Sequence, residues 1–290
     1  MMTPFRDDET IDETDLRRQV DFSIDRGAAA VCVPGLGSEA YKLSDPERYR
    51  VAEIVVDQTR KRKPLIISTG SGSIFNTIEF SRWAEKQGAD CLMVIPPRTA
   101  PLSIKELTLF YERVAGSVGI SIMVQDLDLT GSGIPASVYL DLASRVKNLH
   151  FAKLENPLPG AKCAEIIRGT GGQVQVIFGL WGMYMADGMP RGAGAIMAGP
   201  GITEVYARIV SLFDEGKVEE SRALLYRTLP YMAFCLQHLE AGIVLDKRML
   251  KRRGVIQYDR LREPYLHLEQ TNAEEMDSLI DLVLPLCNKV

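Results

Sequence analysis

The chain has 290 residues, a formal net charge of −4 and an apolar fraction of 46%. These values describe an ordinary globular protein that can bury a large core without disulfides or metal. The chain shows no basic stripe for nucleic acid and no run of the roughly 18 apolar residues that span a bilayer. We therefore expect neither a nucleic-acid nor a membrane partner.

Five cysteines are spread along the chain without a CxxC motif. An odd, scattered set favours reduced thiols, and charges begin at Arg6 before a signal-peptide core could form. We therefore expect a cytoplasmic protein. One basic cluster, residues 247–253, is interpreted as a solvated helix face with Leu250 turned inward; contact with another subunit or an anionic ligand is the alternative.

Short apolar runs alternate with longer amphipathic stretches along most of the chain. Each run has strand length and is mostly apolar on both faces, as a buried parallel strand requires. The stretches between the runs have helix length. We expect strands at 29–33, 64–68, 91–95, 120–124, 150–153, 174–178 and 195–198, and helices at 45–60, 77–87, 104–115 and 134–146.

Two α/β folds share this alternation, an open doubly wound sheet and an eight-stranded (β/α)8 TIM barrel. The open sheet is disfavoured because no Gly-rich dinucleotide fingerprint follows the first run. Residues 1–5 resemble the end of a strand whose start is missing. We therefore predict a barrel over residues 1–215 with a shortened first strand.

After Gly201 the strand pattern stops and four helical stretches follow, at 204–214, 217–235, 240–253 and 273–288. The first could close the barrel. We expect the others to form a C-terminal helical extension over residues 216–290, packed on the barrel as one structural unit.

Lys153 ends the apolar run at 150–153 and precedes a loop. Residues at the carboxyl ends of barrel strands line the active site. Burial disfavours the charged ammonium, and a neutral amine is a nucleophile for carbonyl groups. A lysine turned to solvent or paired with Glu155 is the structural alternative.

Several motifs together resemble one family. They are Thr3-Pro4-Phe5, the loop Gly-Leu-Gly-Ser-Glu at 35–39 with Leu43-Ser44, Gly88-Ala89-Asp90, and Gly192-Ala193-Gly194. Their order and spacing are similar to those of the dihydrodipicolinate synthase/N-acetylneuraminate lyase family over nearly the whole barrel. The resemblance implies that Lys153, at the end of strand six, is the Schiff-base lysine. It also implies that the protein binds pyruvate or another 2-keto acid and forms a homo-oligomer, a dimer or tetramer.

The chain departs from the family pattern at positions that matter for the reaction. Leu36 and Gly37 stand where the family loop has two threonines, and Gln125-Asp126 replaces a Tyr-Asn pair. The arginine with which the synthase holds its semialdehyde is absent from 128–131. Dihydrodipicolinate synthase proper is therefore disfavoured. The Gln-Asp and Lys-x-Glu motifs resemble those of dehydratases and aldolases that act on 2-keto-3-deoxy sugar acids.

A class I aldolase mechanism needs a proton carrier besides the covalent imine on Lys153. Glu155 lies two residues further along an extended strand, so both side chains point the same way. Asp126 is the second candidate, whereas Gln125 cannot shuttle protons and is assigned to substrate binding.

The other binding residues are expected around the imine. Gly37 and Ser38 would donate to the keto acid's carboxylate, Arg98 could hold a distal carboxylate, and Gly179 and Ile196 would line the floor. No metal is expected, because the three histidines lack ligand spacing, and no other cofactor is expected. The sequence does not separate a dehydratase from an aldolase. A non-catalytic or keto-acid-binding barrel that has lost the tyrosine relay is the alternative.

Overall fold

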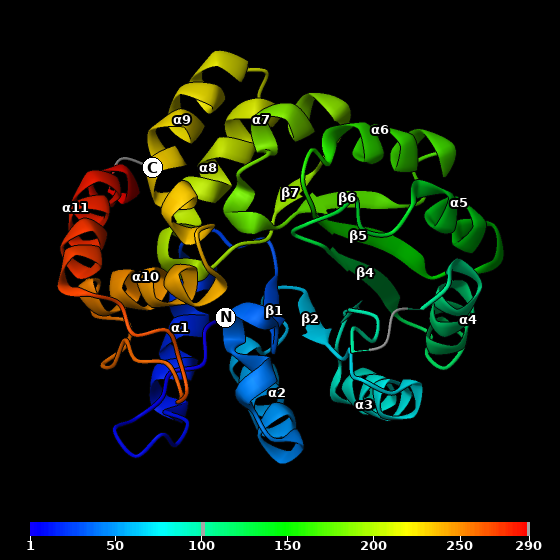
Figure 1. Ribbon diagram of the computed structural model, residues 1–290, viewed down its shortest axis with the longest axis horizontal. Helices are drawn as coiled ribbons and strands as arrows, with labels where there is room; N and C mark the ends of the chain where they lie inside the picture. Colours follow the sequence, from blue (N-terminus) through cyan, green and yellow to red (C-terminus); the bar gives the residue numbers. More distant parts are fainter. Residues whose placement is uncertain (100–101, 289–290) are drawn as a thin grey trace. The chain divides into compact units, whose positions relative to one another are not determined.

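The computed structural model describes residues 1–99 and 102–288 (Figure 1). The chain divides into two compact units. One contains Met1–Lys63, Leu180–Met183 and Ala198–Val290, and the other contains Pro64–Gly179 and Tyr184–Met197. The first is called the terminal unit below and the second the central unit. Within the described residues, no helix is both long and apolar enough to cross a bilayer.

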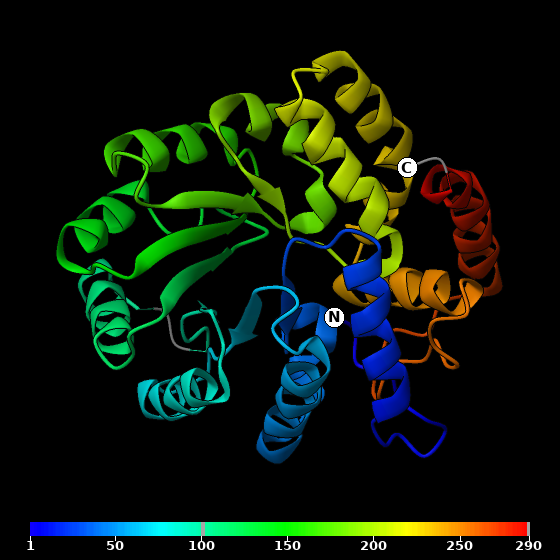
Figure 2. The ribbon, with the colours of Figure 1, turned by 180° about the vertical axis from the view of Figure 1, so that it is seen from behind.

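The central unit is a parallel sheet in which each strand pairs with the next along the chain. Four helices follow the strands and lie along one side of them in both views (Figures 1 and 2). The α/β class is thereby confirmed. The strands are β2 (Leu65–Ser68), β3 (Cys91–Val94), β4 (Ser121–Leu127), β5 (Leu149–Glu155), β6 (Gln175–Phe178) and β7 (Ala195–Ile196); the helices are α3 (Ile74–Gln87), α4 (Ile104–Ala115), α5 (Ala136–Arg145) and α6 (Gly160–Gly169), with a short α7 (Met185–Gly188) before β7.

Strand register brings the predicted site residues together. Gln125 on β4 lies opposite Lys153 on β5, and Leu127 lies opposite Glu155. On the other side of β5, Lys153 faces Ile177 of β6. Because the strands are parallel, their carboxyl ends meet at one edge of the sheet, and Lys153 stands two residues from the end of β5.

The terminal unit contains both ends of the described chain. Helix α1 packs on α2 and β1, and α9 packs on α8, α10 and α11. Met2 shares a buried apolar cluster with five residues from the second half of the chain: Ile243, Leu250, Val255, Ile256 and Leu261. The elements are α1 (Glu13–Asp25), β1 (Val31–Val33), α2 (Asp45–Thr59), α8 (Thr203–Asp214), α9 (Val218–Cys235), α10 (Leu239–Arg252) and α11 (Gln270–Cys287).

The predicted short strand at residues 1–5 is not confirmed. Phe5 makes an isolated antiparallel bridge with Ile11, and Pro4 has no N–H to donate to a ladder. The Met1 amino group donates to the Cys32 carbonyl at 2.7 Å, so the segment still touches β1. The described residues therefore form seven strands, and Lys153 lies on the fifth of them, not the sixth. The predicted boundary between the barrel (residues 1–215) and the C-terminal helical extension (residues 216–290) stays a prediction.

The interpretation of residues 247–253 as a solvated helix face is wrong for Lys247. Its side chain is 0% exposed on α10, where it pairs with Glu39. Leu250 is buried, as predicted. Lys251 and Arg252 are exposed, so the basic stretch covers both faces of the helix.

Candidate active site

Three predicted site residues form one hydrogen-bonded group in the central unit. Lys153 Nζ lies 3.0 Å from Glu155 Oε1, and Gln125 Nε2 donates to Glu155 Oε2 at 2.7 Å. All three are buried. Lys153 and Glu155 lie on the same face of β5, and the ladder places Gln125 beside them from β4. A lysine amine and a carboxylate are thus held in contact, and both are largely buried.

Gly179 makes room for this group. A Cβ placed at Gly179 would lie 2.2 Å from Glu155 Oε1 and 2.4 Å from Glu155 Cγ. No real Cβ makes such contacts, so a side chain at 179 would displace the Glu155 carboxylate. The Gly179 N–H donates to the Leu154 carbonyl at 3.1 Å, and the role of Gly179 in lining the substrate site stays a prediction.

Asp126 has a different environment, although it follows Gln125 directly. Its carboxylate accepts the Ile134 N–H at 2.9 Å, the Tyr139 hydroxyl at 3.1 Å and Lys162 Nζ at 2.7 Å. Burial, and then the Asp126 charge, raise the pKa of Tyr139 well above its usual value. These contacts tie the start of α5 and Lys162 of α6 to the end of β4. The arrangement favours Glu155 over Asp126 as proton carrier.

The model of the dihydrodipicolinate synthetase family matches residues 1–282. The chain belongs to this family. The predictions of the family and of a lyase with its class I aldolase chemistry are confirmed.

Two curated relatives of the chain carry different activities in their names. The chain is 27% identical to L-2-keto-3-deoxyarabonate dehydratase of Azospirillum brasilense over 292 residues, which cover 98% of this chain and 93% of the relative. It is 32% identical to 4-hydroxy-tetrahydrodipicolinate synthase of Pelobacter propionicus over 228 residues, 77% of each chain.

Solved structures share the fold. Dihydrodipicolinate synthase from Rhodopseudomonas palustris is similar with a TM-score of 0.89 and 24% identity, over 97% of this chain and 95% of that one. YagE, a prophage protein of E. coli K12 solved in complex with pyruvate, is similar with a TM-score of 0.88 and 22% identity, over 98% and 96% of the two chains.

The family loop at 35–39 belongs to the terminal unit. It forms a 3-10 turn, Leu36–Ser38, in which the Ser38 N–H donates to the Gly35 carbonyl at 3.0 Å. The Ser38 hydroxyl donates to the Met1 carbonyl at 2.5 Å and accepts the Gly35 N–H at 3.0 Å. Both donors of Ser38 are therefore used inside the loop, and carboxylate binding through them would require these bonds to exchange. The roles of Gly37 and Ser38 stay predictions.

The two remaining predicted residues, Arg98 and Ile196, belong to the central unit. Arg98 is exposed in the segment that follows β3 and makes no ion pair with another described residue. Ile196 is half-buried on β7, where it pairs with Phe178 of β6. Their binding roles also stay predictions.

Sequence reasoning missed two lysines that hold carboxylates in place, Lys162 with Asp126 and Lys247 with Glu39. Lys162 stands in the first turn of α6, where a basic residue opposes the helix dipole. That misplacement is a weak signal that the side chain has another partner. For Lys247 the only local signal was a lysine next to apolar residues.

Proposed function

We propose that the chain is a lyase that binds a 2-keto-3-deoxy sugar acid as an imine on Lys153 and removes water from it. No metal or organic cofactor takes part. The observation that carries the proposal is the contact of Lys153 with Glu155, which is itself held by Gln125. The A. brasilense dehydratase, similar over 98% of this chain, supports the choice of a dehydratase.

The reaction follows from the three side chains. The Lys153 amine attacks the C2 carbonyl, and loss of water leaves a protonated imine that acts as an electron sink. Glu155 removes a C3 proton to give the enamine, then returns a proton to the C4 hydroxyl, which departs as water. Hydrolysis of the imine releases the dehydrated keto acid and restores the amine. Gln125 orients the carboxylate and binds substrate, since an amide cannot carry the proton.

An aldolase is the second candidate. The same enamine pathway, run through cleavage of C3–C4, would release pyruvate. The fold shared with YagE in complex with pyruvate is the observation that favours it. Dihydrodipicolinate synthesis is disfavoured because Gln125 replaces the family tyrosine and 128–131 lack the arginine. A non-catalytic barrel is disfavoured because the Lys153–Glu155 contact keeps a nucleophile beside a proton carrier.

Several finer features belong to the same proposal. We propose that the fold closes as a (β/α)8 barrel, by likeness to the solved relatives over 97% of the chain. Gly37 and Ser38 would bind the carboxylate, with Arg98 and Ile196 toward the distal end of the substrate. A cytoplasmic homo-oligomer, a dimer or tetramer, is proposed from the family resemblance and from the odd, scattered set of cysteines without a CxxC motif.

Borohydride trapping with pyruvate tests the imine. Wild-type protein should gain a covalent adduct on Lys153, located by peptide mass spectrometry, and Lys153→Ala should gain none and lose all turnover. The matched control is Lys147→Ala, an exposed lysine just before β5, which should trap like the wild type. Absence of an adduct in the wild type, or full turnover by Lys153→Ala, would overturn the Schiff base.

A screen of 2-keto-3-deoxy acids then separates the two candidates. Release of a semialdehyde without pyruvate supports the dehydratase, and release of pyruvate with an aldehyde supports the aldolase. Turnover of none of these acids, with trapping intact, would contradict both.

A further inference from the structure

A second group of polar side chains in the central unit lies between the sheet and helices α5 and α6. Asp126 and Gln125 are neighbours on β4, and successive side chains of a strand point to opposite faces. Gln125 points toward Glu155, to which it donates. The Asp126 carboxylate therefore points the other way, where it accepts the Tyr139 hydroxyl of α5 and Lys162 Nζ of α6.

Three local features of this group are unfavourable by themselves. Lys162 stands in the first turn of α6, where its charge opposes the helix dipole. Its ion pair leaves the Lys162 and Asp126 side chains only 12% and 1% exposed, and two charges are costly to desolvate. Asn156 is 0% exposed, and its Oδ1 accepts no hydrogen bond from any described residue. Proteins break such rules chiefly at functional sites, so the group calls for a reason beyond stability.

The same group fixes the ends of the two strands that carry the proposed chemistry. Asn156 directly follows Glu155, and its Nδ2 donates to the Asp126 carbonyl at 3.4 Å. The Asp126 carboxylate accepts the Ile134 N–H at 2.9 Å. A Cβ at Gly133 would lie 2.0 Å from Asp126 Oδ1, so the backbone before α5 packs directly on the carboxylate. The ends of β4 and β5 are thus held to each other, and to the start of α5, around one carboxylate.

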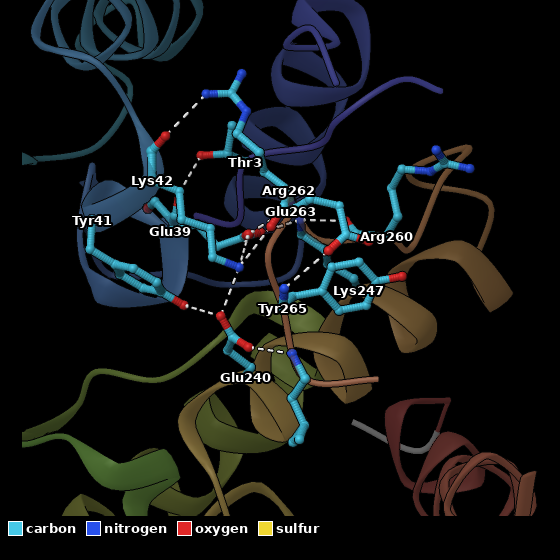
Figure 3. Close-up of polar contacts among 12 residues, drawn as sticks. Thr3, Glu39, Tyr41, Lys42, Glu240, Lys247, Arg260, Arg262, Glu263 and Tyr265 are labelled. Carbon is cyan, nitrogen blue, oxygen red and sulfur yellow. Dashed lines mark hydrogen bonds and ion pairs between the residues drawn. The ribbon is translucent and has the colours of Figure 1, made fainter. Parts of the chain in front are cut away.

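The terminal unit also contains a lysine that holds a buried carboxylate, Lys247 with Glu39 (Figure 3). Lys247 donates in addition to the Arg260 carbonyl at 2.8 Å. The three side chains of the proposed reaction belong to the central unit, however. Lys162 lies in that same unit, and its partner Asp126 is the chain neighbour of one of the three.

We propose that Lys162 is a positioning residue, which acts through Asp126 to keep the Glu155 carboxylate in the place where it takes the C3 proton. The inference rests on the proposed function, in which Glu155 is the proton carrier. Asp126 fixes the end of β4, and the adjacent Gln125 donates to Glu155 Oε2 at 2.7 Å, so a shift of that end moves the carboxylate. Lys162 need not touch the substrate. The expected signature is slower proton transfer at C3 with unchanged imine formation.

The experiment uses pyruvate as the probe and the full-length protein in D2O. Glu155 takes a proton from C3 of the pyruvate imine to give the enamine, exchanges it with solvent, and returns a deuteron to C3. Proton NMR of the pyruvate methyl group measures this exchange, and borohydride trapping measures the imine separately. In Lys162→Met, exchange at saturating pyruvate should slow by about tenfold or more, since small misplacements of catalytic groups cost much rate. Half-saturation and trapping should stay within about twofold, because binding is not altered.

A second variant and a control complete the set. Tyr139→Phe removes one donor to Asp126 and keeps the aromatic ring, so it tests the same group if Lys162→Met does not fold. Its exchange should slow by about threefold, because two of the three donors to the carboxylate remain. Arg168→Met is the matched control, because Arg168 is an exposed basic residue in the last turn of the same helix, and it should exchange like the wild type.

A purely structural role would lower the melting temperature and leave exchange by the folded variants at the wild-type rate; that result would overturn the proposal. A higher half-saturating pyruvate concentration with unchanged exchange at saturation would also overturn it, since affinity and not proton transfer would then depend on Lys162. If neither variant folds, the group is a requirement of the fold and the proposal is wrong. A wild type that traps pyruvate without exchanging C3 protons refutes the proton transfer of the proposed function, and one that traps none refutes the Schiff base.

Discussion

Two buried lysine–glutamate pairs among the described residues, one in each unit, differ in character. In the central unit, Lys153 and Glu155 keep side-chain exposures of 10% and 9%, and among the described residues Glu155 is the only polar contact of Lys153 Nζ. In the terminal unit, Lys247 and Glu39 are fully buried, and both bind backbone groups as well. An ammonium has three N–H groups, so Lys153 retains hydrogen-bonding capacity that Lys247 has largely used.

The difference separates the pair that we propose to be reactive from a pair that is fixed in place. A buried pair whose hydrogen-bonding positions are filled can exchange its partners only at a large cost. The Lys247–Glu39 pair therefore behaves as a fixed tie between segments 208 residues apart. In the proposed mechanism, the Lys153–Glu155 pair parts so that the Lys153 amine can reach a carbonyl carbon.

The largest loss of turnover should come from removing the Glu155 carboxylate of the Lys153–Glu155 pair. Glu155→Gln keeps the shape and a hydrogen bond to Gln125 but removes the proton carrier. Turnover should fall by about 10²-fold or more, as for other lost general acids or bases, while borohydride trapping on Lys153 persists. Steady-state rates together with trapping by mass spectrometry measure both quantities.

Asp126→Asn is the matched carboxylate control, because Asp126 adjoins Gln125 and, like Glu155, is buried. It should lower the melting temperature, since Lys162 and Tyr139 lose their charged partner, and the folded protein should still turn over. If Asp126→Asn is inactive while Glu155→Gln turns over normally, the relay belongs to Asp126.

A smaller loss of turnover should follow from adding a single methyl group beside the Lys153–Glu155 pair. Gly179→Ala places a Cβ where the Glu155 carboxylate now lies, so Glu155 must move. We expect turnover to fall by about tenfold, with the Lys153 adduct still formed, because misplaced catalytic groups lose rate. Gly194→Ala is the control, since a Cβ there meets no atom within 4 Å. Equal rates for the two variants would show that Glu155 need not stay in its position.

The smallest effect concerns pH and the helix that carries the fixed pair. Burial raises the pKa of Asp246 from 3.8 to about 6, so folding favours its protonated form. Its contribution to stability is fully present below about pH 3.8 and is lost as pH rises through about 6. Between about pH 5 and 6.5, the free energy of unfolding of the wild type should fall by about 1 kcal/mol relative to Asp246→Asn. Urea titrations of both proteins measure this change. A wild type whose free energy of unfolding rises relative to that of Asp246→Asn as the pH increases would contradict it.

The strands could be predicted from the sequence because each is an apolar run bounded by turn residues. Their ends could not. The run at 150–153 stops at Lys153, whereas β5 continues to Glu155, and β4 continues through Gln125 and Asp126 to Leu127. Backbone pairing, which composition does not reveal, extends both strands. The polar residues of the site therefore stand inside paired strands, which fixes their spacing.

The contacts of Glu155 could be predicted only in part. Residues two apart on an extended strand point to the same face, which places Glu155 beside Lys153. The close approach of Gly179 depends instead on the path of the chain after β6. The pairing of Lys247 with Glu39 could not be found at all. It joins residues from opposite ends of the chain, and local pattern carries no information about which of many charged residues will meet.

The division of the chain into units bears on the order in which the protein is made. The central unit runs from residue 64 to 197 with one four-residue interruption, whereas the terminal unit joins residues 1–63 to residues beyond 198. During synthesis, α1 and β1 emerge first but must wait for α10 and Arg262, whose side chain binds Glu47 and the Glu9 carbonyl. Domains usually fold in the order of their emergence from the ribosome. Here the nearly continuous central unit is complete on emergence before the terminal unit has its second half.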